Sequence, residues 1–242
     1  MQTLTSQDPV AVAVTDAIRT GDLPRLRRLL TGHPGLATAR ITERGEDGPG
    51  ARSLLHIAAD WPGHRPRGPE VVAVLVAAGA DPDARFGGAH EETPLHWAAS
   101  SNDVPVLDAL VAAGADLEAP GAVIAGGTPL ADALAFGQWR AARRLVGHGA
   151  RTTLQDAATL GLLDRVRAYV ESGEPPSHAD VTSALWGACH GGQPATAQYL
   201  HGRGGDAHRR GHDGLTPLDA ALRQDAGDVV RWLRELGARS GA

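Results

Sequence analysis

Apolar residues along this chain recur every three or four positions, in segments of about ten residues. In the segment 104–112 they include Val106, Leu107 and Leu110, which fall on one side of a helix. Gly114 follows this segment and permits the left-handed conformation that ends many helices. The pattern predicts a chain of short amphipathic helices separated by tight turns.

A second signal marks the first helix of each predicted pair. At 93–99 the chain reads TPLHWAA, with Thr93 placed to cap free amide groups and Pro94 at the first helical position. A helix pair of this size cannot bury its apolar side alone, so successive pairs are expected to stack. The predicted openings are Ser53, Thr93, Thr128, Thr152, Thr182 and Thr216.

This motif, followed by a second helix and Gly-Ala-Asp, resembles the ankyrin repeat. The resemblance implies an all-α solenoid of about seven helix-turn-helix units with short hairpin fingers. It implies a single domain over 1–242, with an N-terminal capping pair at about 10–34 and repeats from about 53. A C-terminal capping repeat is expected at about 213–240. The implied function is recognition of another protein through the concave face and the fingers.

Three departures from a regular repeat are visible in the spacing of the openings. A long loop is expected at 31–52, and an insert at 61–68 separates the two helices of the first full repeat. The hairpin between Gly149 and Thr152 is almost absent. Since such hairpins project beside the concave face, we expect the neighbouring first helices to be uncovered at that point.

One position of the repeat, directly after the histidine of the motif, carries the candidate site. It reads Trp97, Asp132, Asp156 and Trp186 in four repeats, so the two acids are expected to lie side by side between the two indoles. These residues are either core fillers and first-turn acids, or an acidic pocket with aromatic walls. A pocket of this kind would hold a cationic group or form a pair of acid and base carboxyls.

Two further residues complete the candidate binding set. His96 fills the histidine position of the motif, where bonds to backbone groups of neighbouring repeats are the usual arrangement. Trp61 lies in the insert at 61–68. The alternative to a protein-binding module is a small-molecule-binding protein or a cofactor-independent enzyme. In an enzyme, Asp132 and Asp156 would be the catalytic acid and base for hydration, elimination or cyclisation.

Composition narrows the range of functions that remain. The formal charge is −5, and all 23 basic residues are arginine, so neither nucleic-acid binding nor lysine-based catalysis is expected. The single cysteine, Cys189, excludes an internal disulfide, and His201, His208 and His212 match no zinc pattern. We therefore expect no metal, no cofactor and no membrane contact. The expected compartment is the cytoplasm, and the expected partner is a protein or, in the alternative, a small molecule.

Overall fold

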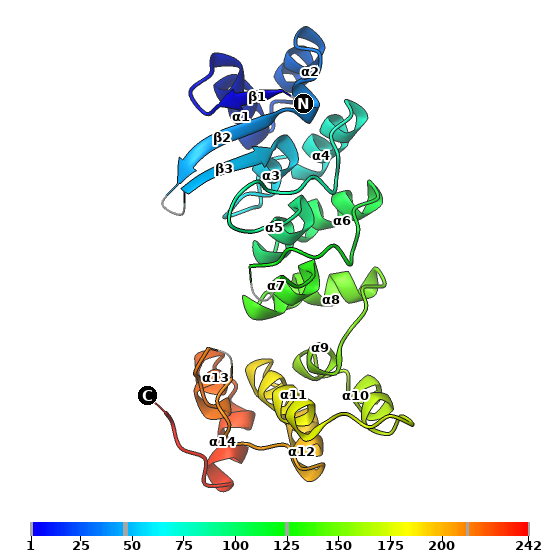
Figure 1. Ribbon diagram of the computed structural model, residues 1–242, viewed down its shortest axis with the longest axis vertical. Coiled ribbons are helices and arrows are strands. Elements are labelled where there is room, and N and C mark those ends of the chain that lie inside the picture. The colour runs from blue at the N-terminus through cyan, green and yellow to red at the C-terminus, as the bar shows by residue number, and fades with distance from the viewer. Residues whose placement is uncertain (1, 46–47, 124–125, 212, 242) are drawn as a thin grey trace. The chain divides into compact units, whose positions relative to one another are not determined.

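Short paired helices make up the protein (Figure 1). The computed structural model describes residues 2–45, 48–123, 126–211 and 213–241. Contacts within the chain divide it into two compact units, Met1–Ala150 (unit 1) and Arg151–Ala242 (unit 2). Each unit is described by itself below, and one continuous domain over 1–242 stays a prediction. The predicted short connection between Gly149 and Thr152 falls at the boundary of the units.

Unit 1 contains helix pairs and a small sheet at its N-terminal end. Its helices are α1 (Pro9–Thr20), α2 (Leu23–Gly32), η1 (Leu36–Thr38), α3 (Leu54–Ala59), α4 (Gly68–Ala77), α5 (Pro94–Ser100), α6 (Val104–Ala112), α7 (Pro129–Ala135) and α8 (Trp139–Gly147). Its strands are β1 (Thr3–Thr5), β2 (Arg40–Gly45) and β3 (Gly48–Ser53).

Unit 2 continues the alternation of first and second helices. Its helices are α9 (Leu154–Thr159), α10 (Leu163–Val170), α11 (His178–His190), α12 (Pro194–Gly202), α13 (Pro217–Arg223) and α14 (Gly227–Glu235). A core of small and branched side chains, among them Ala158, Leu185 and Leu200, is fully buried between them. Small residues at these positions allow the helices to approach closely.

Two layers of helices form each unit. In unit 1 the first helices α1, α3, α5 and α7 contact one another in chain order, and so do the second helices α2, α4, α6 and α8. In unit 2 the same holds for α9, α11 and α13 and for α10, α12 and α14. This stacking confirms the predicted helical solenoid, because each pair buries its apolar side against its neighbours.

The predicted capping residues are confirmed at Ser53, Thr93, Thr128 and Thr216, each of which precedes a first helix. The other two predicted openings are wrong. Thr153, not Thr152, caps α9, and α11 is capped by Ser177, with Thr182 inside the helix. At both corrected positions an acid three residues after the cap, Asp156 or Asp180, completes a capping box.

The predicted loop at 31–52 is partly a β-sheet, which corrects the sequence prediction. Strand β2 pairs antiparallel with β3, with Ile41 opposite Arg52, and parallel with β1. Ile41 is buried, and a bridge between Ala51 and Gly87 ties β3 to the finger that precedes α5. Residues 46 and 47 of this segment lie outside the described residues.

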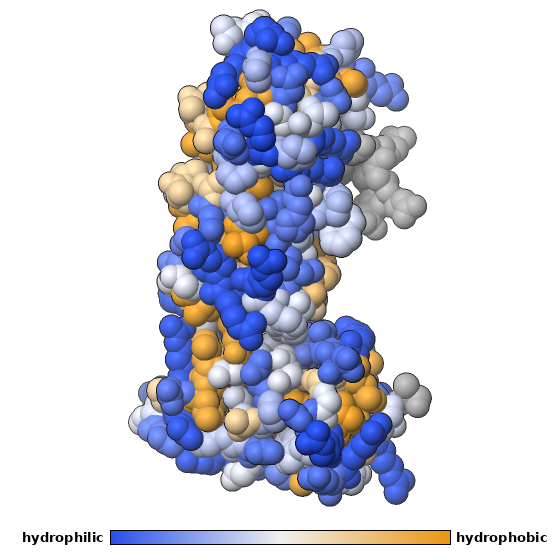
Figure 2. Space-filling view, turned by 180° about the vertical axis from the view of Figure 1, so that it is seen from behind, coloured by the Kyte–Doolittle hydropathy of each residue, from blue (hydrophilic) through white to orange (hydrophobic). Residues whose placement is uncertain are grey.

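The insert at 61–68 lies between α3 and α4, as predicted, and is anchored to the next repeat. The backbone amide of His64 donates a hydrogen bond to Asp103, the capping residue of α6. Trp61 is left 72% exposed at the start of the insert. Hydrophobic and hydrophilic residues are interspersed on the side of the molecule seen in Figure 2. Across the described ranges, we find no helix with the length and apolar character needed to cross a bilayer.

Candidate binding site

A pocket of about 460 Å³ opens on unit 1 where α3, α5 and α7 meet the fingers that precede α5 and α7. Its volume falls in the range of about 300–1,000 Å³ that is usual for ligand pockets. It brings together two of the predicted binding residues, Trp61 and Trp97. The lining residues used below are Asp60, Trp61, Glu92, Trp97, Val123 and Phe136.

Trp97 forms a fixed wall of this pocket. Its indole Nε1 donates a hydrogen bond of 3.0 Å to Glu92 Oε2. The ring packs edge-on against His56 at a centroid distance of 4.8 Å and lies 5.5 Å from the ring of Phe86. Edge-to-face packing of this kind restricts the orientation of the indole. The predicted site residue Trp97 is therefore partly core and partly pocket wall.

His56 and His96 are structural side chains. Their Nδ1 atoms lie 2.7 Å from Ser53 Oγ and 2.9 Å from Thr93 Oγ1, the capping hydroxyls of their helices. Their Nε2 atoms lie 3.0 Å and 3.3 Å from backbone carbonyl oxygens of the fingers that follow. Burial lowers the pKa of His56 to about 3 and that of His96 to about 4, so both rings are neutral at pH 7. His96 is not among the residues that line the pocket.

Asp132 lies behind the pocket wall, on α7. Its side chain is fully buried, and neither carboxyl oxygen has a partner in good hydrogen-bond geometry among the described residues. Burial raises the pKa of Asp132 to about 8, and the neighbouring Glu92 carboxyl adds to the effect, while the Val123 amide opposes it. Asp132 itself does not line the pocket, but Glu92 and Val123, the two residues that act on its carboxyl, both do.

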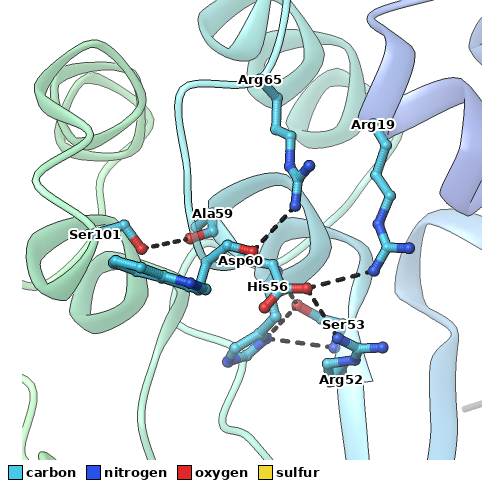
Figure 3. A network of polar contacts seen from close by, with 9 residues as sticks. Arg19, Arg52, Ser53, His56, Ala59, Asp60, Arg65 and Ser101 are labelled. Carbon is cyan, nitrogen blue, oxygen red and sulfur yellow. Dashed lines mark hydrogen bonds and ion pairs between the residues drawn. The ribbon is translucent and has the colours of Figure 1, made fainter.

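Asp60, at the rim of the pocket, is already neutralised by arginines (Figure 3). Its Oδ2 lies 3.5 Å from Arg19 Nη2 and 3.1 Å from Arg52 Nη1. Arg65 in the insert donates a 3.1 Å hydrogen bond to the backbone oxygen of Trp61 and so holds the insert at the rim. Of the two acids that line the pocket, Glu92 rather than Asp60 is therefore the one without an ion pair to an arginine in the described part of the chain.

The other predicted site residues, Asp156 and Trp186, belong to unit 2. Asp156 occupies the histidine position of its motif, one place earlier than predicted, because Thr153 is the cap. Its Oδ2 accepts a 2.8 Å hydrogen bond from the Thr153 amide. Trp186 is 6% exposed, and its Nε1 donates to the Leu215 carbonyl at 3.0 Å. Because Asp132 lies in unit 1, its pairing with Asp156 stays a prediction.

Comparison with known proteins decides the family. A family model described as ankyrin repeats (3 copies) matches residues 55–156. Protein PhlB of Serratia liquefaciens is 32% identical over 175 residues, which cover 65% of this chain and 67% of PhlB. The chain belongs to the ankyrin-repeat family. Ankyrin repeats generally act as protein–protein interaction modules.

Two other ankyrin relatives match a shorter segment. Protein fem-1 homolog A of Rattus norvegicus and protein fem-1 homolog A-A of Mus musculus are each 47% identical over 53 residues. That segment is 22% of this chain but 8% of each fem-1 protein. The similarity to these proteins is therefore confined to repeats. It does not assign the function of the fem-1 proteins to this chain.

Three residues that line the pocket were not predicted from the sequence: Glu92, Val123 and Phe136. Glu92 directly precedes the capping Thr93, and Val123 lies in the finger before the next motif. Glu92 could have been recognised as a charged residue at the base of a finger, directly before α5 begins. Phe136 could have been recognised as an aromatic residue at the end of α7. It follows Asp132 by four residues, which places both on the same side of the helix.

The histidine-rich finger of unit 2 offers few metal ligands within the described chain. No group of three or more His, Cys, Asp or Glu side chains within residues 2–45, 48–123, 126–211 and 213–241 could hold a metal ion. His201 has its Nδ1 3.1 Å from the Gly205 carbonyl oxygen. His212, which the sequence analysis considered with His201 and His208, lies outside the described residues.

Proposed function

We propose that this ankyrin protein recognises a partner protein through the first helices and fingers of unit 1, with the Trp97 pocket as the anchor point. The observation that carries the proposal is a preformed pocket of about 460 Å³ at the junction of three first helices. Protein interfaces concentrate binding energy in a few aromatic anchors and the pockets that receive them. A pocket of this kind suits one side chain of a partner together with part of its neighbour.

The rim of the pocket supports the same proposal. Trp61 is 72% exposed, Phe136 is 50% exposed and Val123 is 41% exposed. Together they form an apolar rim around the entrance, and large apolar side chains grouped at a pocket are typical of a contact surface. Aromatic residues are also enriched at interfaces, since they bury a large area and lose little conformational entropy.

A second candidate function is catalysis or small-molecule binding in the same pocket. The observation that favours it is the buried carboxyl pair of Glu92 and Asp132. With its pKa raised to about 8 by burial and by Glu92, Asp132 is protonated at pH 7. A carboxyl that holds its proton at pH 7 beside a second carboxyl suits cofactor-independent proton transfer, such as hydration, elimination or cyclisation. Here Glu92 takes the place that the sequence analysis gave to Asp156.

Affinity capture with the whole chain tests the proposed recognition. The variant Phe136→Ala removes part of the pocket rim, and Leu222→Ala, at a similarly exposed position of unit 2, is the matched control. We expect one protein, identified by mass spectrometry, to bind wild type and Leu222→Ala and to be lost from Phe136→Ala. Equal recovery of the partner on all three proteins would contradict the use of this pocket.

A further inference from the structure

The carboxyl group of Glu92 is buried and has no basic partner among the described residues. Its side chain is 7% exposed, and the hydrogen bond that it accepts comes from the neutral indole of Trp97. Within the part of the chain that the structure describes, no arginine or histidine forms an ion pair with Glu92. Buried carboxylates in proteins are normally paired with a cation, so this group is suited to receive one from outside.

A second carboxyl group lies next to Glu92. Both oxygens of Asp132 are buried without a hydrogen-bond partner in good geometry among the described residues. Two adjacent carboxyls in a buried site cannot both ionise at low cost, since their charges repel each other. A bound cation removes this cost, because it interacts favourably with both carboxylates at once.

The pocket that Glu92 lines has aromatic walls. Trp61, Trp97 and Phe136 line the pocket, and each can present an electron-rich face or edge to a cation or its alkyl stem. Three apolar walls and an acidic base match a side chain that has a long apolar stem and a cationic tip.

We infer that the Trp97 pocket binds an arginine side chain of the partner protein, with the guanidinium group at Glu92, beside the buried Asp132, and the stem along the aromatic walls. The inference rests on the proposed function and names the residue that the partner inserts. Arginine is preferred over lysine because its planar guanidinium group can donate two hydrogen bonds to one carboxylate and stacks on aromatic rings.

Binding of the cation is coupled to loss of a proton. In the free protein Asp132 holds the proton at pH 7, and the guanidinium group stabilises the ionised form, so the proton passes to the buffer. The buried histidines of α3 and α5 do not titrate in this range. Burial lowers the pKa of His56 to about 3 and that of His96 to about 4, so both rings stay neutral. Affinity therefore rises with pH, by up to about tenfold per pH unit below pH 8.

Calorimetric titration of the whole protein with blocked tripeptides tests the inference. The probes are acetyl-Gly-Arg-Gly-amide, its lysine analogue and its norleucine analogue, each at pH values between about 6 and 8. We expect the arginine probe to bind several-fold more tightly than the lysine probe, to release a proton and to bind more tightly as pH rises. No binding of the arginine probe at about 10 mM, or equal binding of the norleucine probe, overturns the inference.

Matched variants separate the charge from the fold. Glu92→Gln is expected to weaken the arginine probe at least about tenfold, whereas Glu91→Gln, at the exposed neighbouring residue, leaves it unchanged. Asp132→Asn is expected to remove the dependence on pH. If Glu92→Gln fails to fold, Phe136→Leu at the exposed rim still tests the aromatic wall, and it should weaken the arginine probe more than the norleucine probe.

The outcomes distinguish this inference from the proposed function. If the arginine probe does not bind but Phe136→Ala loses the captured partner, the pocket is a docking site for a different side chain and the arginine assignment is wrong. If the probe binds but Phe136→Ala keeps the partner, the pocket is a ligand site and the proposed recognition surface is wrong.

Discussion

Replacement of the buried Asp132 by asparagine should change how the stability of unit 1 depends on pH. Folding moves this carboxyl from water to a buried place beside Glu92, which raises its pKa from 3.8 to about 8. The folded protein therefore holds a proton that the unfolded chain has lost. Between these two pKa values, the free energy of unfolding falls as pH rises; below about pH 4 both states are protonated, and the effect is absent.

The magnitude follows from the size of the shift. One pKa unit corresponds to about 1.4 kcal/mol, so wild type loses about 1.4 kcal/mol of stability for each pH unit in this range. From pH 6.5 to pH 8 the loss is about 2 kcal/mol. Asparagine has nearly the same shape and does not ionise, so Asp132→Asn should gain about 2 kcal/mol relative to wild type over this window.

Between pH 6.5 and pH 8 the buried histidines do not mask the effect of Asp132 on stability. Burial lowers the pKa of His56 to about 3 and that of His96 to about 4, whereas in the unfolded chain both titrate near 6.5. Their linkage to stability therefore acts below pH 6.5, where it has the opposite sign. The difference between variant and wild type also cancels their contribution, since both proteins carry both histidines.

Urea unfolding followed by circular dichroism at four pH values measures the effect. Asp116→Asn, at an exposed acid in a finger of the same unit, is the matched control and should differ from wild type by a constant amount. A difference between Asp132→Asn and wild type that stays within about 0.5 kcal/mol from pH 6.5 to pH 8 would refute the reasoning. Asp132 would then ionise as an exposed acid does, and the buried carboxyl pair would not exist.

Three further predictions concern unit 2. Asp156→Asn should lower the free energy of unfolding by up to about 1 kcal/mol through the lost capping box, and it should not affect ligand binding in unit 1. Loss of that binding would instead support the acid pair expected from the sequence. Gly191→Ala should lower the free energy of unfolding by more than about 2 kcal/mol, since the new Cβ would lie 1.8 Å from a backbone oxygen. Gly202→Ala has open space around it and should be neutral or stabilising. Leu185→Ala should cost about 2–5 kcal/mol as a fully buried leucine, and Leu154→Ala less, because Leu154 is partly exposed; equal losses in urea unfolding would contradict this packing.

The helical repeat could be read from the sequence because its signals are local. The caps at Ser53, Thr93, Thr128 and Thr216 combine a hydroxyl residue with a following helix, and the structure confirms each. The register failed where two threonines are adjacent, since either one can cap. Asp156 settles the choice, because an acid three residues after the cap completes the box only with Thr153.

The carboxyl pair could not be read in the same way. Glu92 belongs to a finger and Asp132 to a helix of the next repeat, and they meet only because the two repeats stack. Their spacing of 40 residues matches no local period. The hairpin of β2 and β3 was missed for a different reason. Its glycine and charged residues have little preference for strands, and it forms through pairing with β1 and a bridge to Gly87.

Carbon-13 NMR of the side-chain carboxyls, recorded against pH with and without the arginine tripeptide, tests the central claim most directly. In the free protein the Asp132 signal should titrate near pH 8. With the tripeptide bound, its midpoint should move down by one pH unit or more, about the shift that a neighbouring guanidinium group produces. A midpoint near pH 4 in the free protein, or one near 8 that the tripeptide leaves unchanged, would contradict an arginine pocket built on Glu92 and Asp132.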